Sequence, residues 1–217
     1  MLYSFAQKET FERDLMSFTS LTVSSNFTVS IKQTNRYAVN YTVWNEQLKN
    51  ENIQFIFSGD NLEIKYFGNI ISELDIHFEL EVEQLTHFTV KNGGEIKLES
   101  PFDANNSPLS INTQFGGKFY GEFQQTPWIK VSVNQGGNIQ LKGDVKLVDF
   151  SIRMGGTIDA SQLTAENVNA SVTLGGTINC QANTLLDAKV NGGGTIRYTG
   201  DGQVMKEVKL GGSINRI

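Results

Sequence analysis

The sequence has few of the residues that build catalytic and metal sites, and no segment that could cross a membrane as a helix. Its 217 residues include one cysteine, Cys180, which excludes an internal disulfide framework and a zinc site made of several cysteines. It has two histidines, His77 and His87, and both precede residue 88. No run of about 18 apolar residues occurs, so no transmembrane segment is predicted.

Basic residues, proline and helical patterns are also scarce. Lys and Arg total 18 against 23 Asp and Glu, a net charge of −5, which argues against nucleic acid as a partner because nucleic-acid binding needs a cationic face. There are three prolines, and long apolar patterns with a 3.6-residue period are absent. Short runs of β-branched and aromatic residues dominate instead, which predicts an all-β fold.

Glycine is abundant, but only in the second part of the chain. Of the 21 glycines, only Gly59 and Gly68 precede residue 92. Most of the others form seven pairs that recur every 18 to 23 residues. We predict that these pairs are structural turns: Gly93-Gly94, Gly116-Gly117, Gly136-Gly137, Gly155-Gly156, Gly175-Gly176, Gly193-Gly194 and Gly211-Gly212.

The phase of the apolar residues around each pair is constant. An apolar residue stands two positions after every pair, and a Val or Ile stands three positions before most of them, the exception being the polar Thr113. One such repeat of strand, turn and strand cannot bury its own apolar side, so equivalent residues must stack between repeats. The pattern predicts a parallel β-helix, or solenoid, with about seven Gly-Gly-centred coils. The alternative is an antiparallel sandwich with Gly-Gly hairpins, but the fixed period and phase favour the solenoid.

The part before the first pair is predicted to form irregular β structure. Several segments there alternate like strands, and no Pro- or Ser-rich linker separates them from the repeats. We therefore expect a single domain over residues 8–217, with irregular N-terminal coils or a cap at 8–90 and regular coils at 91–217. Residues 1–7 are similar at Ser4-Phe5-Ala6 to the end of a secretory signal, so they are either a signal-peptide remnant or a disordered end.

The order of these segments resembles a known family. It runs from a Phe-x-x-Leu-x-Val strand, through Phe27-Thr-Val-Ser-Ile-Lys-Gln33, to repeated units such as Met154-Gly-Gly-Thr-Ile158. This is similar to the head GIN domain family of autotransporter adhesins, common in gut Bacteroidetes and formerly a domain of unknown function. The turns of family members usually read Gly-Ser-Gly-Asp-Ile. In this chain the Ser between the two glycines is absent, and Thr replaces Asp at position 157. The resemblance implies a β-helical, exported, cell-surface protein with a role in adhesion, and it brings no catalytic residues.

The spacing of the candidate reactive residues in the sequence does not predict a catalytic or metal site. The outward position after Ile158 holds Asp159 in one coil and mixed residues in the others, so Asp144, Asp149 and Asp159 predict no carboxylate cluster. Glu79, Glu81 and Glu83 alternate on one strand and are expected to be a solvated face rather than a cation site. Cys180 has the inward phase of a small buried hydrophobic residue. We therefore predict no catalytic residue, no metal site and no cofactor.

Two longer departures from the repeat have more potential for binding. They are Glu99–Pro108 and Phe123–Trp128, and their aromatic residues Phe102 and Trp128 are the predicted ligand contacts, unless these rings pack over the solenoid flank. The resulting hypothesis is a non-enzymatic exported surface or periplasmic protein, a monomer or weak oligomer, that serves as an adhesin or interaction scaffold for a glycan or protein. The alternative function is a carbohydrate-active lyase or hydrolase on a β-helix, which would need a groove with paired carboxylates.

Overall fold

The computed structural model describes residues 9–43, 52–68 and 76–217, and their secondary structure is built of 18 strands. Within these ranges, no helix is long and apolar enough to cross a membrane. The strands are β1 (Glu9–Asp14), β2 (Ser20–Val23), β3 (Thr28–Gln33), β4 (Ala38–Val43), β5 (Ile53–Ser58), β6 (Asn61–Tyr66), β7 (Ile76–Val82), β8 (His87–Val90), β9 (Glu95–Leu98), β10 (Phe102–Asp103), β11 (Leu109–Gln114), β12 (Lys118–Asn134), β13 (Asn138–Met154), β14 (Thr157–Leu174), β15 (Thr177–Asn191), β16 (Thr195–Thr199), β17 (Gln203–Lys209) and β18 (Ser213–Arg216).

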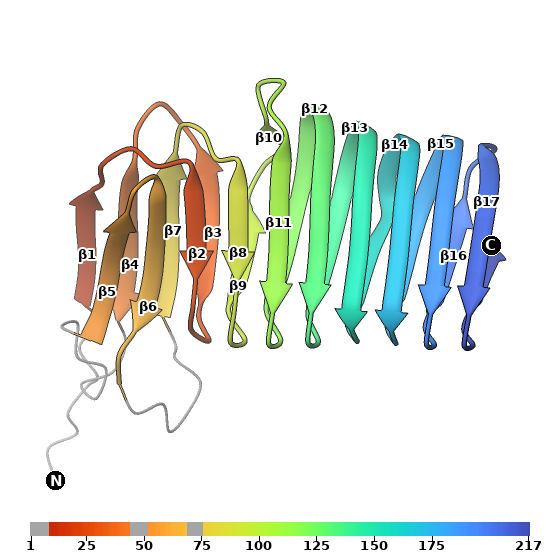
Figure 1. Ribbon diagram of the computed structural model, residues 1–217. Helices are drawn as coiled ribbons and strands as arrows, with labels where there is room; N and C mark the ends of the chain where they lie inside the picture. The colour runs from red at the N-terminus through yellow and green to blue at the C-terminus, as the bar shows by residue number, and fades with distance from the viewer. Residues whose placement is uncertain (1–8, 44–51, 69–75) are drawn as a thin grey trace, which may run out of the picture.

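The chain coils into a β-solenoid, as the glycine repeat predicts, and the solenoid has about 6 turns (Figure 1). Strands that precede a Gly-Gly pair stack in parallel as one sheet, sheet 1, and strands that follow a pair stack as a second, sheet 2. Each of the long strands β12 to β15 contributes its first half to sheet 2 and its second half to sheet 1. Only the short β18 follows the seventh Gly-Gly pair. The seven pairs therefore correspond to about 6 full coils of the solenoid.

The core between the two sheets is a set of side-chain ladders. In sheet 2, Ile139, Ile158 and Ile178 pair with one another in register, and each is fully buried. Neighbouring coils lie about 4.8 Å apart, so equivalent aliphatic side chains contact each other directly. The complete ladder is Ile96, Phe119, Ile139, Ile158, Ile178, Ile196 and Ile214.

The N-terminal part adds antiparallel strands and an inserted coil. In sheet 2 the order is β1-β4-β7-β3-β9, and β4 runs antiparallel to both of its neighbours. Strands β2 and β3 form an early coil that lies between β6 and β7 on one side and β8 and β9 on the other. Aromatic rings continue the core here, with Tyr41 at 5.1 Å from Phe11 and 5.2 Å from Phe78 between ring centroids. The assignment of 8–217 to a single domain stays a prediction, and residues 1–7 lie outside the described residues.

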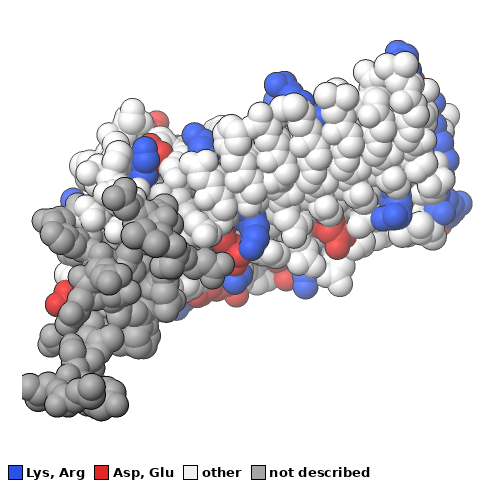
Figure 2. All heavy atoms as spheres, turned by 90° about the horizontal axis from the view of Figure 1, so that it is seen from below, with Lys and Arg blue, Asp and Glu red and all other residues white. Residues whose placement is uncertain are grey.

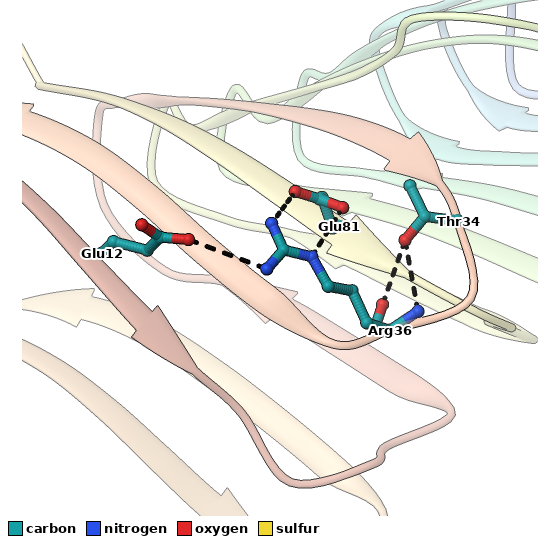
Figure 3. A network of polar contacts seen from close by, with 4 residues as sticks. All are labelled: Glu12, Thr34, Arg36 and Glu81. Carbon is teal, nitrogen blue, oxygen red and sulfur yellow. Dashed lines mark hydrogen bonds and ion pairs between the residues drawn. The ribbon is translucent and has the colours of Figure 1, made fainter.

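A polar network joins the N-terminal strands on their outer side (Figure 3). Arg36, in the link between β3 and β4, donates from Nε to Glu81 of β7 at 3.0 Å and lies 3.7 Å from a carboxylate oxygen of Glu12 on β1. The Arg36 backbone N–H also donates to the Thr34 hydroxyl at 3.3 Å. The hydrogen bond from Arg36 and its positive charge hold the pKa of Glu81 below its usual value. Glu81 is therefore engaged in an ion pair and is not part of a row of free carboxylates.

The glycine turns combine positive φ with close approach between coils. Each of the seven pairs contains at least one glycine at positive φ. The second glycine also lies against the preceding coil: a Cβ on Gly156 would be 2.5 Å from Cγ1 of Val133 and 2.7 Å from the Gly137 carbonyl oxygen. A side chain at Gly156 would force the two coils apart, and φ is positive there, so this position needs glycine for two separate reasons.

Candidate functional site

Trp128 lies on the outer surface of sheet 1, where its ring is partly open to solvent. Its exposed fraction is 37%, and the flanking Ile129 is fully buried, as alternation along β12 requires. The indole Nε1 donates a 2.9 Å hydrogen bond to Oδ2 of Asp149 on β13, and Asp149 Oδ1 accepts a 2.6 Å hydrogen bond from Asn169 on β14. In the strand register Trp128 lies beside Leu147 of β13, whereas its hydrogen-bond partner Asp149 lies two residues further along that strand. The ring therefore extends diagonally across the neighbouring coil. The indole is thereby held in one orientation, with part of its surface available to a ligand.

A groove lies beside Trp128, at the corner of the coils opposite the glycine turns. We call it the corner groove, and its volume is about 370 Å³. It crosses several successive coils, because its lining comes from the loop before β11 and from β12, β13, β14 and β15. The lining residues are Asn106, Thr126, Pro127, Asp144, Val145, Lys146, Thr164, Glu166 and Asn183.

One wall of the corner groove is the loop between β10 and β11, which rises above the upper edge of the solenoid (Figure 1). Asn105 and Asn106 at its tip both have positive φ, and the Ser107 N–H donates to the Ala104 carbonyl at 2.9 Å, as in a type I′ turn. Asn tolerates this conformation better than most residues other than glycine, which explains the Asn-Asn sequence.

Two glutamines from the N-terminal part anchor the same loop. The Gln33 side chain both donates to the Asp103 carbonyl, at 3.0 Å, and accepts from the Asp103 N–H, at 2.9 Å. Gln84 donates from its side-chain amide to the Ala104 carbonyl at 3.1 Å. These contacts join residues 70 and 20 positions apart in the chain, so the wall is fixed by the tertiary structure and not only by its own turn.

The two departures from the repeat therefore meet in space, but only one of the two predicted aromatic contacts is accessible. Strand β10 pairs with β12 through Phe102 and Phe123, which brings Asn106 to the same groove as Thr126 and Pro127. Phe102 itself is 1% exposed, and its ring packs edge-on against Phe88. The prediction that Phe102 contacts a ligand is wrong, because the ring fills the core beneath the loop. The role of Trp128 as a ligand contact stays a prediction.

The reactive groups singled out in the sequence do not form a metal centre within the described ranges of the chain. Cys180 is buried, and burial raises the pKa of its thiol to about 12, so the reactive thiolate form is disfavoured at neutral pH. In the part of the chain that the structure describes, no group of three His, Cys, Asp or Glu residues could hold a metal ion. Of the aspartates considered, Asp149 holds Trp128 and Asp144 lines the corner groove, where Glu166 is a second carboxylate.

Sequence reasoning missed an apolar row beside the glycine turns. Four residues that stand directly before a Gly-Gly pair have exposed apolar side chains, and we call this row the turn edge: Phe115, Met154, Leu174 and Leu210. Seen from below, the turns of the C-terminal half form a band with few charged side chains (Figure 2). The signal in the sequence was the apolar residue immediately before four of the pairs.

Comparison with known proteins agrees with this architecture. The family model described as "Putative auto-transporter adhesin, head GIN domain" matches residues 17–202. Among solved structures, a "putative adhesin" from Bacteroides fragilis has a TM-score of 0.86 at 19% identity, over 97% of each chain. A "putative adhesin" from Parabacteroides distasonis has a TM-score of 0.76 at 18% identity over 98% of each chain, and a "putative lipid binding protein" from that species has 0.70 at 20% identity over 97% of this chain and 96% of its own. No curated protein sequence matches this chain.

Proposed function

Because the chain belongs to the head GIN domain family of auto-transporter adhesins, we propose that it is a non-enzymatic, exported binding protein that attaches to a glycan or protein at a cell surface. We place the contact on the outer surface of sheet 1 around Trp128. The observation that carries this proposal is a partly exposed indole, fixed by Asp149 and Asn169, on an otherwise regular surface. Rigid aromatic side chains of this kind dominate the affinity of many interfaces.

The proposal has further parts that follow from charge and shape. A net charge of −5 does not suit nucleic acid, so we exclude nucleic acid as the partner. We place the protein in the periplasm, on the outer surface or outside the cell, in line with its family. We also propose that it works as a monomer or weak oligomer, with the ligand bound along the flank of one solenoid.

The enzymatic alternative has one observation in its favour, the two carboxylates of the corner groove. A glycoside hydrolase needs one of its two carboxyl groups to stay protonated near neutral pH, which usually requires burial in an apolar environment. Asp144 and Glu166 are both exposed side chains, beside the exposed Lys146. This environment suits hydrogen bonding to a ligand better than proton transfer, so binding is the function we favour.

The test is the substitution Trp128→Ala, assayed against an array of glycans and a panel of extracellular matrix proteins. We expect binding to the ligand found with the wild-type chain to weaken at least tenfold, because the indole supplies the main apolar contact. The melting temperature is expected to change by only a few degrees, since the ring lies outside the ladders. Phe115→Ala, which removes an exposed aromatic ring from the turn edge, is the matched control and should bind normally.

Two outcomes would contradict the proposal. One is unchanged binding by Trp128→Ala together with loss of binding by Phe115→Ala, which would move the contact to the turn edge. The other is unfolding of Trp128→Ala, which would make the indole a structural residue.

A further inference from the structure

We propose that the corner groove binds an uncharged oligosaccharide, whose chain continues from the groove onto the open surface of the Trp128 indole. This inference rests on the proposed function, because it names the ligand class for the same side of the molecule. It goes beyond that function in assigning the groove, its two carboxylates and its fixed wall to ligand recognition.

The shape of the groove suits a linear polymer. Its lining residues come from successive coils, from Thr126 on β12 through Val145 on β13 to Asn183 on β15. With coils about 4.8 Å apart, the four levels from β12 to β15 span about 14 Å along the solenoid axis, and the Asn106 loop lies beside them. A chain of pyranose rings advances by a similar step at each unit, so successive rings can meet equivalent positions on successive coils. A compact small molecule would use only part of this length.

The chemistry of the lining matches sugar hydroxyls. Asp144 and Glu166 present carboxylate oxygens, which accept two hydrogen bonds side by side, and Asn106 and Asn183 present amides that both donate and accept. Pro127 supplies an apolar surface for the C–H side of a ring. A hydroxyl group both donates and accepts hydrogen bonds, and this lining offers acceptors and donors to match, without a charged group on the ligand being required.

The charge of the lining selects against acidic sugars. Two carboxylates and one ammonium, that of Lys146, give a local charge of −1 (−2 + 1). The whole chain is also negative, at −5. A uronic acid or sialic acid would bring its carboxylate close to Asp144 and Glu166, and that like-charge contact lowers affinity.

The indole adjoins one end of the groove, because Pro127 lines the groove and Trp128 is the next residue. Thr126 pairs with Val145 in the groove, and on the same two strands Trp128 pairs with Leu147, two residues further along. A chain that leaves the groove over Pro127 therefore meets the indole next. Both parts are fixed before binding, the wall by Gln33 and Gln84 and the indole by Asp149, so little conformational entropy is lost when the ligand binds.

The experiment compares neutral and acidic tetrasaccharides by titration calorimetry on the full chain. The neutral probes are cellotetraose, mannotetraose and tetra-N-acetylchitotetraose, and the acidic probe is tetragalacturonate. We expect at least one neutral probe to bind at least tenfold more tightly than the acidic one. We also expect binding to shift the Trp128 indole N–H resonance, assigned by its absence in Trp128→Phe.

Isosteric variants connect this binding to the groove. Asp144→Asn and Glu166→Gln keep the size of each side chain and remove its charge, and each is expected to weaken the neutral ligand about tenfold. Asp159→Asn is the matched control, because Asp159 lies on sheet 2, where it accepts from the Ser161 N–H, and it should change affinity less than twofold.

The outcomes separate this inference from the proposed function. Tighter binding of tetragalacturonate, or no binding of any neutral probe at millimolar concentration, overturns the inference. If a protein ligand then still depends on Trp128, the proposed function stands without the sugar. Neutral-sugar binding that depends on Glu166 but not on Trp128 supports the groove and overturns the contact proposed at the indole.

Discussion

The substitution Gly156→Ala is expected to lower the free energy of unfolding by about 4 kcal/mol, although it adds a single methyl group. Gly156 has φ of 111°, which alanine adopts only with strain of about 1–3 kcal/mol. The methyl would also lie 2.7 Å from the Gly137 carbonyl oxygen and 2.5 Å from Cγ1 of Val133. Relieving these contacts means displacing the preceding coil, at a further cost of about 1–3 kcal/mol.

Its neighbour Gly155 supplies the control for this experiment. Gly155 has φ of 68°, and a Cβ there would meet nothing within 4 Å. Gly155→Ala should therefore cost only the strain of the left-handed conformation, about 1–2 kcal/mol. Urea denaturation of the two variants measures the difference. Equal losses would mean that close stacking between coils is not what requires the second glycine.

The substitution Ile158→Ala should have the next largest effect, a loss of about 2–5 kcal/mol in the free energy of unfolding. Ile158 is fully buried and stacks in register between Ile139 and Ile178, so its truncation leaves a cavity lined from three coils. Thr157→Ala, one residue earlier and only half-buried, should change stability by less than about 1 kcal/mol. Comparable losses for the two variants would contradict the ladder.

The solenoid could be predicted because its signal repeats. Residues two positions after each glycine pair kept the same phase over seven turns, and the structure places them in one ladder. The outward position of Trp128 also follows from alternation, since Val133, Val131 and Ile129 are inward when counted back from the next turn. Local periodicity is enough for such inferences, because stacked coils pair equivalent residues.

The N-terminal topology could not be predicted, because its pairing is neither local nor periodic. Strands β2 and β3 lie between strands that come much later in the chain, and no repeat marks which ones. The burial of Phe102 was hidden for a related reason. Strand β9 ends at Leu98 and β10 begins at Phe102, so alternation cannot be carried across the segment between these two strands.

The corner groove could not be predicted from the sequence either. Its wall depends on Gln33 and Gln84, which lie 70 and 20 residues from their partners in the loop. Its carboxylates, Asp144 and Glu166, are brought together by neighbouring coils and share no motif. Asp144 was considered from the sequence together with Asp149 and Asp159, but Glu166, the neighbour of Asp144 in the groove, was not.

The measurement that tests the central claim most directly is native mass spectrometry of the chain with the neutral tetrasaccharide that binds it most tightly. The masses of the free sugar and of the complex are measured at the start and after prolonged incubation. A binding protein predicts a complex of one chain with one intact tetrasaccharide, and no change in the mass of the free sugar. Shorter sugars that accumulate with the wild-type chain, but not with Asp144→Asn or Glu166→Gln, would contradict the account and give those carboxylates a catalytic role.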